Sequence, residues 1–597
     1  MENLVKRQFV TLTIFLTLAL PLLVAFVPPR QSGTDIQLST SVGYGGYYRQ
    51  GQWIPVRITI SNTGDEDLDG YIRVRTGAVG GLEETVYRTP IDLPRGSRKQ
   101  VFLYISLENF DSNLEVEVVD RDSSLIKREP ASLQMAQATD ILYAVVTESI
   151  YGAVDLAALW PGVGQAYQTN WQIDDIPPLA EALAGLDVLM FHDADTGSLN
   201  TEQTTAITRW VLEGGHLIVT GGDAWQRTSG GLQALLPVSL QGTVPLDSLL
   251  PLADYLGLPG ELLNEETTAA NSSLIATAYT LVSAGDVPLI VRHAFGSGTV
   301  DFLAIDPHAE PFRSWGEKER LWYTLIASVG QKPSWGRGFS NWETARDATM
   351  TTSSTVLPTL LQLCGFLLLY IVLIGPINYL LLKRINRREW AWFTIPVLII
   401  LFSVLAYRVG FNLRGNEPIV NRLSVVRVWA DSEQAQVVSL VGVQSPRRTS
   451  YDVAAEPGYT LRTLPETGIG LNVPVTVSEG TRYRAEDVLI DAGMVGSFIV
   501  SGYTAAPELE ASATWHLSDK APRLLGSITN TTGFRLQEAV LLVKGEAREL
   551  GTLEPDQTRS FDITLGPQDP GPLSLGSSAY RYAPNAYSTW GYSAYIP

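Results

Sequence analysis

Short runs of alternating apolar and polar residues fill the region 36–135. Val56, Ile58 and Ile60 alternate with polar residues, and turn sequences such as Pro94-Arg95-Gly96 separate these runs. A period of two places every second side chain on the same face of a strand. The pattern predicts an antiparallel, Ig-like β-sandwich over 31–136.

A related pattern returns near the C-terminus. The segment SITNTTGFRLQEAVLLV is similar to ITISNTGDEDLDGYIRV, which aligns Asn530 with Asn62. The similarity has two interpretations: a repeated Ig-like module at 516–566, or two β-hairpins that use the same turn chemistry. The intervening region 418–515 is also rich in alternating runs, so we expect a further β-sandwich domain there.

The middle of the chain, 137–335, has a different period. The runs 141–146 and 188–191 are continuously apolar, as expected for buried parallel strands. The stretch 201–214 has apolar residues at helical spacing, with Asn200 as the expected N-cap. Buried strands that alternate with helices predict a flavodoxin-like α/β domain with a parallel sheet.

Three stretches are apolar for long enough to cross a membrane. The first lies within 1–30, behind Lys6 and Arg7, and is typical of an uncleaved signal anchor. The other two, 354–383 and 390–409, flank a loop at 384–389, so we expect a transmembrane helical hairpin.

Basic residues set the expected orientation of these spans. Lys383, Arg384, Arg387 and Arg388 lie at the loop, which the positive-inside rule assigns to the cytoplasm. Lys6 and Arg7 place the N-terminus on the same side. The prediction is a multi-pass protein of the cell membrane in contact with membrane lipid, with 31–354 and 410–597 outside the cytoplasm.

Gly375, Pro376 and Asn378 interrupt the second span. A proline removes one backbone donor, so we expect a local kink; a contact with a partner helix or a conduction path is the alternative. The uncharged stretches of the three spans, 9–27, 356–382 and 390–407, contain no Asp, Glu, Lys or Arg, which disfavours a pump or an ion channel.

Composition narrows the function further. A chain of 597 residues is long enough for several domains, and its net charge of −19 argues against a nucleic-acid partner. The single cysteine excludes a disulfide framework and a cysteine-rich metal cluster.

The segment LDVLMFHDADTGSLNTEQTTAITRWVLEGGHLIVTGG resembles the core of class I glutamine amidotransferase-like domains, in particular their non-catalytic, membrane-tethered members. His308-Ala309-Glu310 matches the His-x-Glu element of that family. The nucleophile is missing, because the turn after 217–219 reads Thr220-Gly221-Gly222-Asp223 and Cys364 lies in the second span. Together with the hairpin sequence GPINYLLLKR, the resemblance implies a catalytically inactive member of a bacterial multi-domain envelope family of unknown function.

Several His and acidic residues follow the predicted strands. Because the carboxyl ends of parallel strands meet at one edge of a sheet, we expect some of them to converge there. Such a group offers ligands for a divalent metal ion or an acid and a base, although solvated loop residues and helix caps are the simpler interpretation. The candidates are His192, Asp193, Asp195, Asp223, Asp306, His308 and Glu310.

The sequence favours a non-enzymatic, membrane-anchored envelope protein whose exported domains bind or scaffold partner proteins, without a cofactor. One alternative is a metal-assisted or acid–base hydrolase that acts on an envelope substrate at the strand edge. The other is a glycan-binding module that uses aromatic rings, either near Tyr44 and Trp53 or in the aromatic-rich tail at 567–597.

Overall fold

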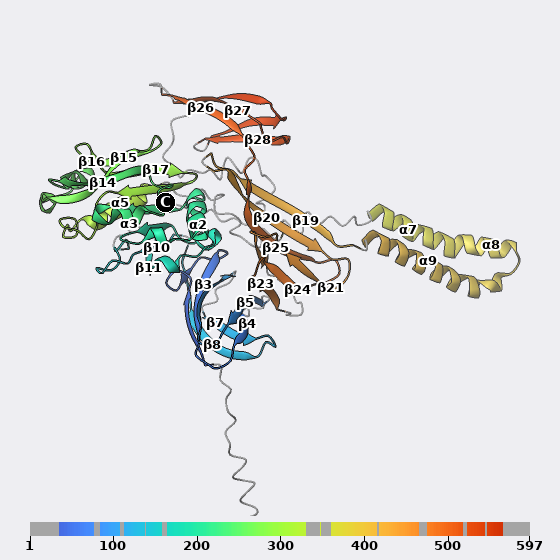
Figure 1. Cartoon of the computed structure of the whole chain (residues 1–597). Coiled ribbons are helices and arrows are strands. Elements are labelled where there is room, and N and C mark those ends of the chain that lie inside the picture. Colours follow the sequence, from blue (N-terminus) through green and yellow to red (C-terminus); the bar gives the residue numbers. More distant parts are fainter. Residues whose placement is uncertain are drawn as a thin grey trace, which may run out of the picture.

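The fold is taken from a computed structural model of the whole chain (Figure 1). The structure describes residues 35–564 except for several short segments and one long stretch before the apolar helices. The undescribed residues within that range are 77–83, 108–112, 138, 158–163, 330–346, 348–359, 415–416, 431, 465–473, 518–521 and 544–545. The expected anchor at 1–30 and the tail at 567–597 lie outside the described residues.

The N-terminal region forms two facing sheets that enclose one apolar core. Ile54, Val56, Ile58 and Ile60 of β3 are fully buried and alternate beyond Val56 with more exposed residues, because every second side chain faces the core. One sheet holds β1 (Ile36–Val42), β3 (Trp53–Asn62) and β6 (Arg98–Ser106); the other contains β4 (Leu68–Thr76), β5 (Thr85–Leu93), β7 (Asn113–Asp120) and β8 (Leu125–Ser132). The short strands β2 (Tyr47–Tyr48) and β9 (Gln134–Met135) pair with each other.

Strands from beyond the apolar helices continue the second of these sheets. β23 (Val475–Ser478) pairs in parallel with β5, and β24 (Arg484–Ile490) and β21 (Thr449–Ala454) extend it further. The region 418–515 is therefore joined to the first module rather than separate from it, as the sequence suggested, because many of its buried residues, among them Leu461, Val477 and Phe498, belong to the same core. Leu440, Leu464 and Ile499 form a small cluster apart from that core. Figure 1 shows these orange strands beside the blue ones.

The rest of that region forms a four-stranded sheet. Its order is β19 (Ile419–Arg427), β20 (Gln434–Gln444), β25 (Val495–Ala505) and β22 (Thr460–Leu464), all antiparallel. Among the described strands, β19 pairs only with β20 and forms an edge of the sheet.

Residues 141–327 form a seven-stranded sheet covered by helices. Asn200 accepts a hydrogen bond from the Gln203 backbone and caps helix α2 (Thr201–Leu212), as predicted. Ile207 and Trp210 lie on the buried apolar face of that helix. The strand order is β11 (Ala166–Trp171), β10 (Ile141–Val146), β12 (Val188–Phe191), β13 (His216–Thr220), β18 (Gly298–Leu303), β17 (Val287–Phe295) and β16 (Tyr279–Ala284). The first five strands run parallel to one another, β17 runs antiparallel to β18, and β16 runs antiparallel to β17.

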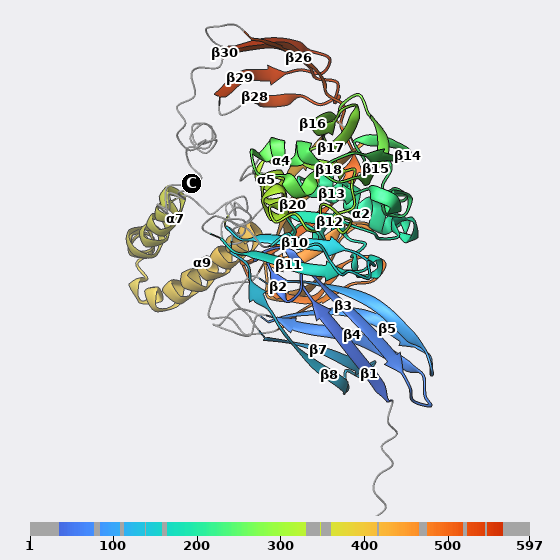
Figure 2. The ribbon, with the colours of Figure 1, turned by 90° about the vertical axis from the view of Figure 1, so that its left-hand side faces the viewer.

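Further elements surround this sheet. A two-stranded sheet lies beside it, and three more helices and several short 3-10 turns complete the unit (Figure 2). The elements are α3 (Trp225–Ser229), α4 (Leu250–Leu256), α5 (Lys318–Ala327), β14 (Val238–Leu246), β15 (Thr267–Leu274), η1 (Ile173–Asp175), η2 (Ala180–Ala182), η3 (Thr196–Ser198), η4 (Gly222–Ala224) and η5 (Glu261–Leu263).

Two apolar helical stretches, Leu360–Arg384 and Arg388–Arg408, are long enough to cross a membrane. They project side by side from the β-rich body (Figures 1 and 2). A π-helical turn at η7 (Leu373–Ile377), which contains Gly375 and Pro376, interrupts the first, and Asn378 follows it in a buried position. The elements are α7 (Leu360–Val372), α8 (Asn378–Arg384), η8 (Arg388–Trp390) and α9 (Ala391–Arg414).

The C-terminal module repeats the hydrogen bonds of the first one. The Asn62 amide donates to the carbonyls of Glu66 (2.7 Å) and Leu93 (3.1 Å), and the Asn530 amide donates to those of Phe534 (2.7 Å) and Leu553 (3.0 Å). The strands are β26 (Glu510–His516), β27 (Arg523–Thr529), β28 (Leu536–Val543), β29 (Glu546–Leu553) and β30 (Thr558–Thr564).

Candidate functional site

The candidate site lies at the edge where the parallel strands of the α/β sheet end. His192 follows β12 directly, Thr220 is the last residue of β13, and Asp306 and His308 lie in the loop after β18. Since β12, β13 and β18 are adjacent and parallel, their carboxyl ends bring these side chains together.

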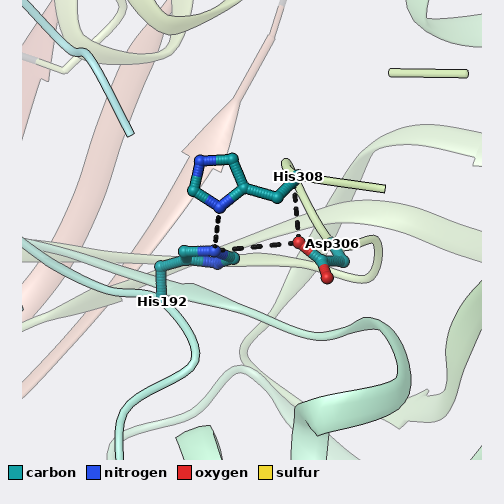
Figure 3. Close-up of side chains that lie close together, drawn as sticks. All are labelled: His192, Asp306 and His308. Carbon is teal, nitrogen blue, oxygen red and sulfur yellow. Dashed lines mark hydrogen bonds and ion pairs between the residues drawn. The ribbon is translucent and has the colours of Figure 1, made fainter. Parts of the chain in front are cut away.

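His192, Asp306 and His308 form one compact group (Figure 3). His192 Nε2 lies 2.7 Å from His308 Nδ1 and 3.8 Å from Asp306 Oδ1. The His308 backbone N–H donates to the same Asp306 oxygen at 2.8 Å. One ligand atom from each residue lies within 4.8 Å of the other two, a spacing that allows a single metal ion to contact all three.

A hydrogen-bond relay fixes the orientation of the His192 ring. Its Nδ1 lies 3.1 Å from Thr220 Oγ1, and the Thr220 hydroxyl donates to the Phe191 carbonyl at 3.4 Å. Because the hydroxyl proton is used on the carbonyl, its oxygen accepts from Nδ1–H, which assigns the lone pair of the ring to Nε2. That lone pair faces His308 and Asp306, and such outer partners typically orient metal-binding histidines.

Both imidazoles resist protonation. Burial lowers the pKa of His192 to about 4, although the nearby Asp306 carboxylate favours the charged form. Burial also lowers the pKa of His308, again against the effect of Asp306. At neutral pH both rings are therefore neutral, and in the absence of a metal His308 Nδ1–H donates to the Nε2 lone pair of His192. A metal ion bound at both nitrogens would require His308 to carry its proton on Nε2 instead.

The loop after β13 approaches Asp306 very closely. Gly222 has a φ of +74°, and a Cβ on this residue would lie 2.7 Å from the Asp306 Cβ. Only glycine fits both the left-handed backbone and this contact. Asp193, at the neighbouring strand end, also has a positive φ of 43°, which is uncommon for a residue with a side chain.

Arg227 on helix α3 holds two acidic side chains beside the group. It donates to Asp193 Oδ1 at 3.0 Å and to the Glu148 carboxylate, which follows β10. The Asp193 carboxylate is therefore paired with the Arg227 guanidinium, and Asp193 is not part of the group formed by His192, Asp306 and His308. Neither Arg227 nor Thr220 was among the residues predicted for this site; the position of Thr220 at a strand end was the available signal.

Three of the predicted acids lie apart from this group. Asp195 and Asp223 are exposed residues at short 3-10 turns. Glu310 accepts from the Ser314 backbone N–H at 3.2 Å and pairs with Arg313 at 2.9 Å. None of these three side chains belongs to the group of His192, Asp306 and His308, so the expectation that they converge with His192 is wrong for them.

The aromatic residues near the start of the first module are not free on a surface: Tyr48 and Trp53 belong to the core of that module, and Tyr44 belongs to the core of the α/β region. Tyr44, Tyr48 and Trp53 are at most 5% exposed, and Tyr47 stacks on Tyr167 with a centroid distance of 3.9 Å. These rings are therefore not a surface for stacking on sugars, which corrects the glycan-binding interpretation of this cluster. The aromatic residues of the tail lie outside the described residues.

Comparisons with known proteins leave the function open. Two family models match, each described as a domain of unknown function: DUF8726 at residues 35–134 and DUF8725 at residues 512–593. No curated protein matches the chain.

Similar solved structures were also found. Two are cytoplasmic proteins of Salmonella typhimurium, with 16% and 15% identity and TM-scores of 0.24 and 0.26; the matches cover 32% of this chain and all of each other chain. A third is an exo-β-1,4-mannosidase of an Opitutaceae bacterium, with 12% identity, a TM-score of 0.22 and coverage of 34% and 37%. Scores this low establish neither a common fold nor a common activity.

Proposed function

We propose that this chain is a membrane-anchored envelope protein whose exported α/β region binds one divalent transition-metal ion. His192 Nε2, His308 Nδ1 and an Asp306 oxygen are the proposed ligands. The observation that carries this proposal is the mutual spacing of these atoms, all within 4.8 Å of one another. Two imidazoles and one carboxylate are a donor set typical of zinc and of non-haem iron sites.

The proposed membrane topology has support from the sheet that joins distant segments. β5 and β23 pair with each other and lie on opposite sides, in sequence, of the two apolar helices. A direct pairing requires both strands to be on the same side of the membrane, so the chain between them must cross an even number of times. The basic residues between the two helices favour a cytoplasmic loop.

We also propose that the α/β region is an inactive amidotransferase-like domain. The turn after β13, where that family places its cysteine, contains Gly221 and Gly222, and Cys364 belongs to helix α7. Since a thiol is absent from that turn, chemistry at this edge would use the histidines and the aspartate, either with a bound metal or as an acid and a base. A metal-assisted hydrolase is the second candidate, favoured by the partial exposure of Asp306 and His308, which leaves room for a bound water.

Metal titration of the purified protein tests the first proposal. The full chain in detergent, stripped with a chelator, is titrated with Zn²⁺ by calorimetry, and bound zinc is counted by mass spectrometry. We expect one equivalent, and a loss of affinity of at least 100-fold in His308→Gln and Asp306→Asn.

His516→Gln is the matched control, because this histidine lies in the distant strand β26. It should retain the wild-type affinity. Binding that is absent in the wild type, or equally strong in His308→Gln, would overturn the metal proposal.

A partner-binding role is favoured by strand β19. Ile419, Val420, Leu423 and Val426 are between 45% and 62% exposed, and the strand pairs only with β20 among the described strands. An exposed apolar edge is suited to an extended segment of another envelope protein, which would add a strand to the sheet.

Site-specific photocrosslinking in intact membranes tests this role. A crosslinker at Val420 or Leu423 should yield one adduct of defined mass, which disappears when Val425 is changed to proline. Adducts no stronger than those from exposed Thr201 on helix α2 would contradict it.

A further inference from the structure

A cavity of about 170 Å³ lies where the α/β region meets the four-stranded sheet that contains β20 and β25. Its walls come from three parts of the chain: the segment 178–181 around η2, residues 201–209 of α2, and residues 458 and 503 of the β-rich region. A cavity of roughly 150 Å³ already holds a benzene-sized molecule, so this one has room for a small organic ligand.

Hydrogen bonds between α2 and the sheet hold the cavity walls in place. Arg209 donates from Nε and Nη2 to Gln434 Oε1, at 3.1 and 2.8 Å, and its guanidinium lies 4.0 Å from the centroid of the Tyr503 ring. Glu213, at the end of α2, accepts hydrogen bonds from the Tyr503 hydroxyl and from Gln436 Nε2. The walls are therefore fixed by protein contacts and do not need a ligand to form.

Glu181 is a buried acid of this lining without a cationic partner. It is only 9% exposed. Arg209 favours its charged form electrostatically, but the two make no ion pair in the part of the chain that the structure describes. Burial raises the pKa of Glu181 to about 7, and the charge of Glu213 adds to the effect. Because a buried carboxylate without a counter-charge is unfavourable, a cation that enters the cavity would be held there.

The rest of the lining indicates the size and polarity of that cation. Glu181 is buried and Glu202 is exposed, so the cavity opens to solvent on one side. With Glu181 ionised, the lining holds two negative groups and the positive Arg209. The Thr205 hydroxyl offers a further hydrogen-bond acceptor. A short carbon chain that ends in a positively charged donor fits this combination, because the remaining lining is largely apolar: Pro178, Leu179, Ala180 and Ala206.

We propose that this cavity binds a small primary amine, whose ammonium group pairs with the Glu181 carboxylate. An ammonium group supplies one positive charge and three donors, and charge-assisted hydrogen bonds of this kind are strong. Simple alkylamines and amino acids share this chemistry; in an amino acid, the carboxylate would be directed to Arg209. The proposal does not depend on the metal site, because none of His192, Asp306 and His308 lines the cavity.

Titration of the full chain in detergent, followed by ligand-observed NMR at pH 8, tests the proposal. At this pH Glu181 is mostly ionised and an alkylamine is protonated. We expect propylamine to bind about 10-fold or more tightly than 1-propanol, which has the same carbon chain, and than propionate, which has the opposite charge. Equal binding of propylamine and 1-propanol, or a preference for propionate, would overturn the proposal.

Glu181→Gln removes the buried charge with little change of shape. We expect it to weaken propylamine binding by about 10-fold or more. The matched control is Glu202→Gln, which removes the same charge from the exposed side of the cavity and should weaken binding by less than about threefold, because solvent screens that carboxylate. Equal losses in the two variants would assign the effect to the overall negative field and overturn the role of Glu181.

A second variant keeps Glu181 unchanged and fills the cavity instead. Thr205→Phe places a ring among the lining residues and should abolish propylamine binding. Thr204→Phe, at the neighbouring position of α2 that does not line the cavity, should bind as the wild type does. Melting temperatures confirm that both variants fold. Wild-type affinity in folded Thr205→Phe would place the amine elsewhere and overturn the proposal.

L-Alanine distinguishes the two sources of the ammonium group. If L-alanine binds more tightly than propylamine, and Arg209→Gln removes the difference, the ligand is an amino acid. If propylamine binds more tightly, the ligand is a simple amine. Failure of both to bind would overturn the proposal, whatever the result of the zinc titration.

Discussion

Asp301 is a carboxylate with almost no solvent exposure in the middle of the α/β sheet. Arg292 donates to both of its oxygens, at 2.6 Å each, and His216 Nε2 lies 2.9 Å from one of them. Burial alone would raise the pKa of Asp301, but the hydrogen bonds and charge of Arg292, together with His216, hold it below the ordinary value. The charge of the buried Asp301 carboxylate is therefore compensated only while Arg292 and His216 are in place.

Arg292→Leu should therefore destabilise the protein strongly. The change leaves Asp301 as a buried, uncompensated charge, which typically costs about 3–5 kcal/mol. Thermal denaturation of the solubilised chain measures the effect. The control is Arg313→Leu, which removes the exposed pair with Glu310 and should have a much smaller effect, because solvent screens that pair. Similar losses in the two variants would contradict the assignment.

The two repeat asparagines give a second prediction at this scale. Asn62→Ala and Asn530→Ala each remove the amide that satisfies two backbone carbonyls, and each should destabilise its own module by about 2 kcal/mol or more. Hydrogen exchange resolved by module measures both changes. Alanine at exposed Asp65 should have little effect; a loss as large there would argue against the special role of the buried amides.

Only some of the site residues could be predicted from the sequence. His192, Asp306 and His308 could be predicted because each follows an apolar run that forms a parallel strand. Arg227 could not, because it comes from helix α3, and the helical pattern does not tell which strand end an arginine will reach. The same limit explains Asp195 and Asp223, which also come within four residues of a strand end, as Asp306 does, but are exposed to solvent.

At the scale of elements, the contact between η2 and β25 contains a buried acid. Glu181 lines a pocket with Arg209 of α2 and Tyr503 of β25. Burial raises the pKa of Glu181 to about 7, and the charge of Glu213 adds to the effect, while Arg209 opposes it. The folded protein thus favours the protonated, neutral form of Glu181 at the contact between η2 and β25.

The sign of the resulting pH dependence follows from the raised pKa. Between the ordinary value of 4.5 and about 7, the unfolded chain loses the proton of Glu181 and the folded protein keeps it. Stability should therefore be full below pH 4.5 and fall as the pH rises through 7, by on the order of 3 kcal/mol. Melting temperatures at pH 5 and pH 8 measure the change, and Glu181→Gln should reduce the difference. An unchanged difference in that variant would refute the assignment.

Whole strands were predicted well where their pattern is local and poorly where their partner is distant. The alternation around Ile58 and the N-cap at Asn200 each determine an element within a few residues. No local pattern encodes the parallel pairing of β23 with β5, whose contacts span 390 positions between Arg88 and Ser478. For this reason the region 418–515 was predicted as a separate domain.

At the scale of the whole molecule, the proposed topology predicts which sites are accessible from each side. In a Cys364→Ser background, a cysteine at Asn386, in the loop between the apolar helices, should react with an impermeant thiol reagent only after the membrane is opened. Cysteines at Asp122 and Glu510, which are exposed on the first and last modules, should react in intact cells. Labelling of Asn386 and Asp122 from the same side would refute the topology.

The pairing of β5 with β23 also means that the first module is synthesised well before the strand that completes its sheet. During synthesis at about 5–20 residues per second, the 390 positions between Arg88 and Ser478 take roughly 20–80 s to appear. In the proposed topology, the first module is exported during that interval with the open side of β5 exposed, while the two apolar helices enter the membrane. Its maturation would then depend on helix insertion, and a chain that stalls at the hairpin would present an unpaired strand that is prone to aggregation or proteolysis.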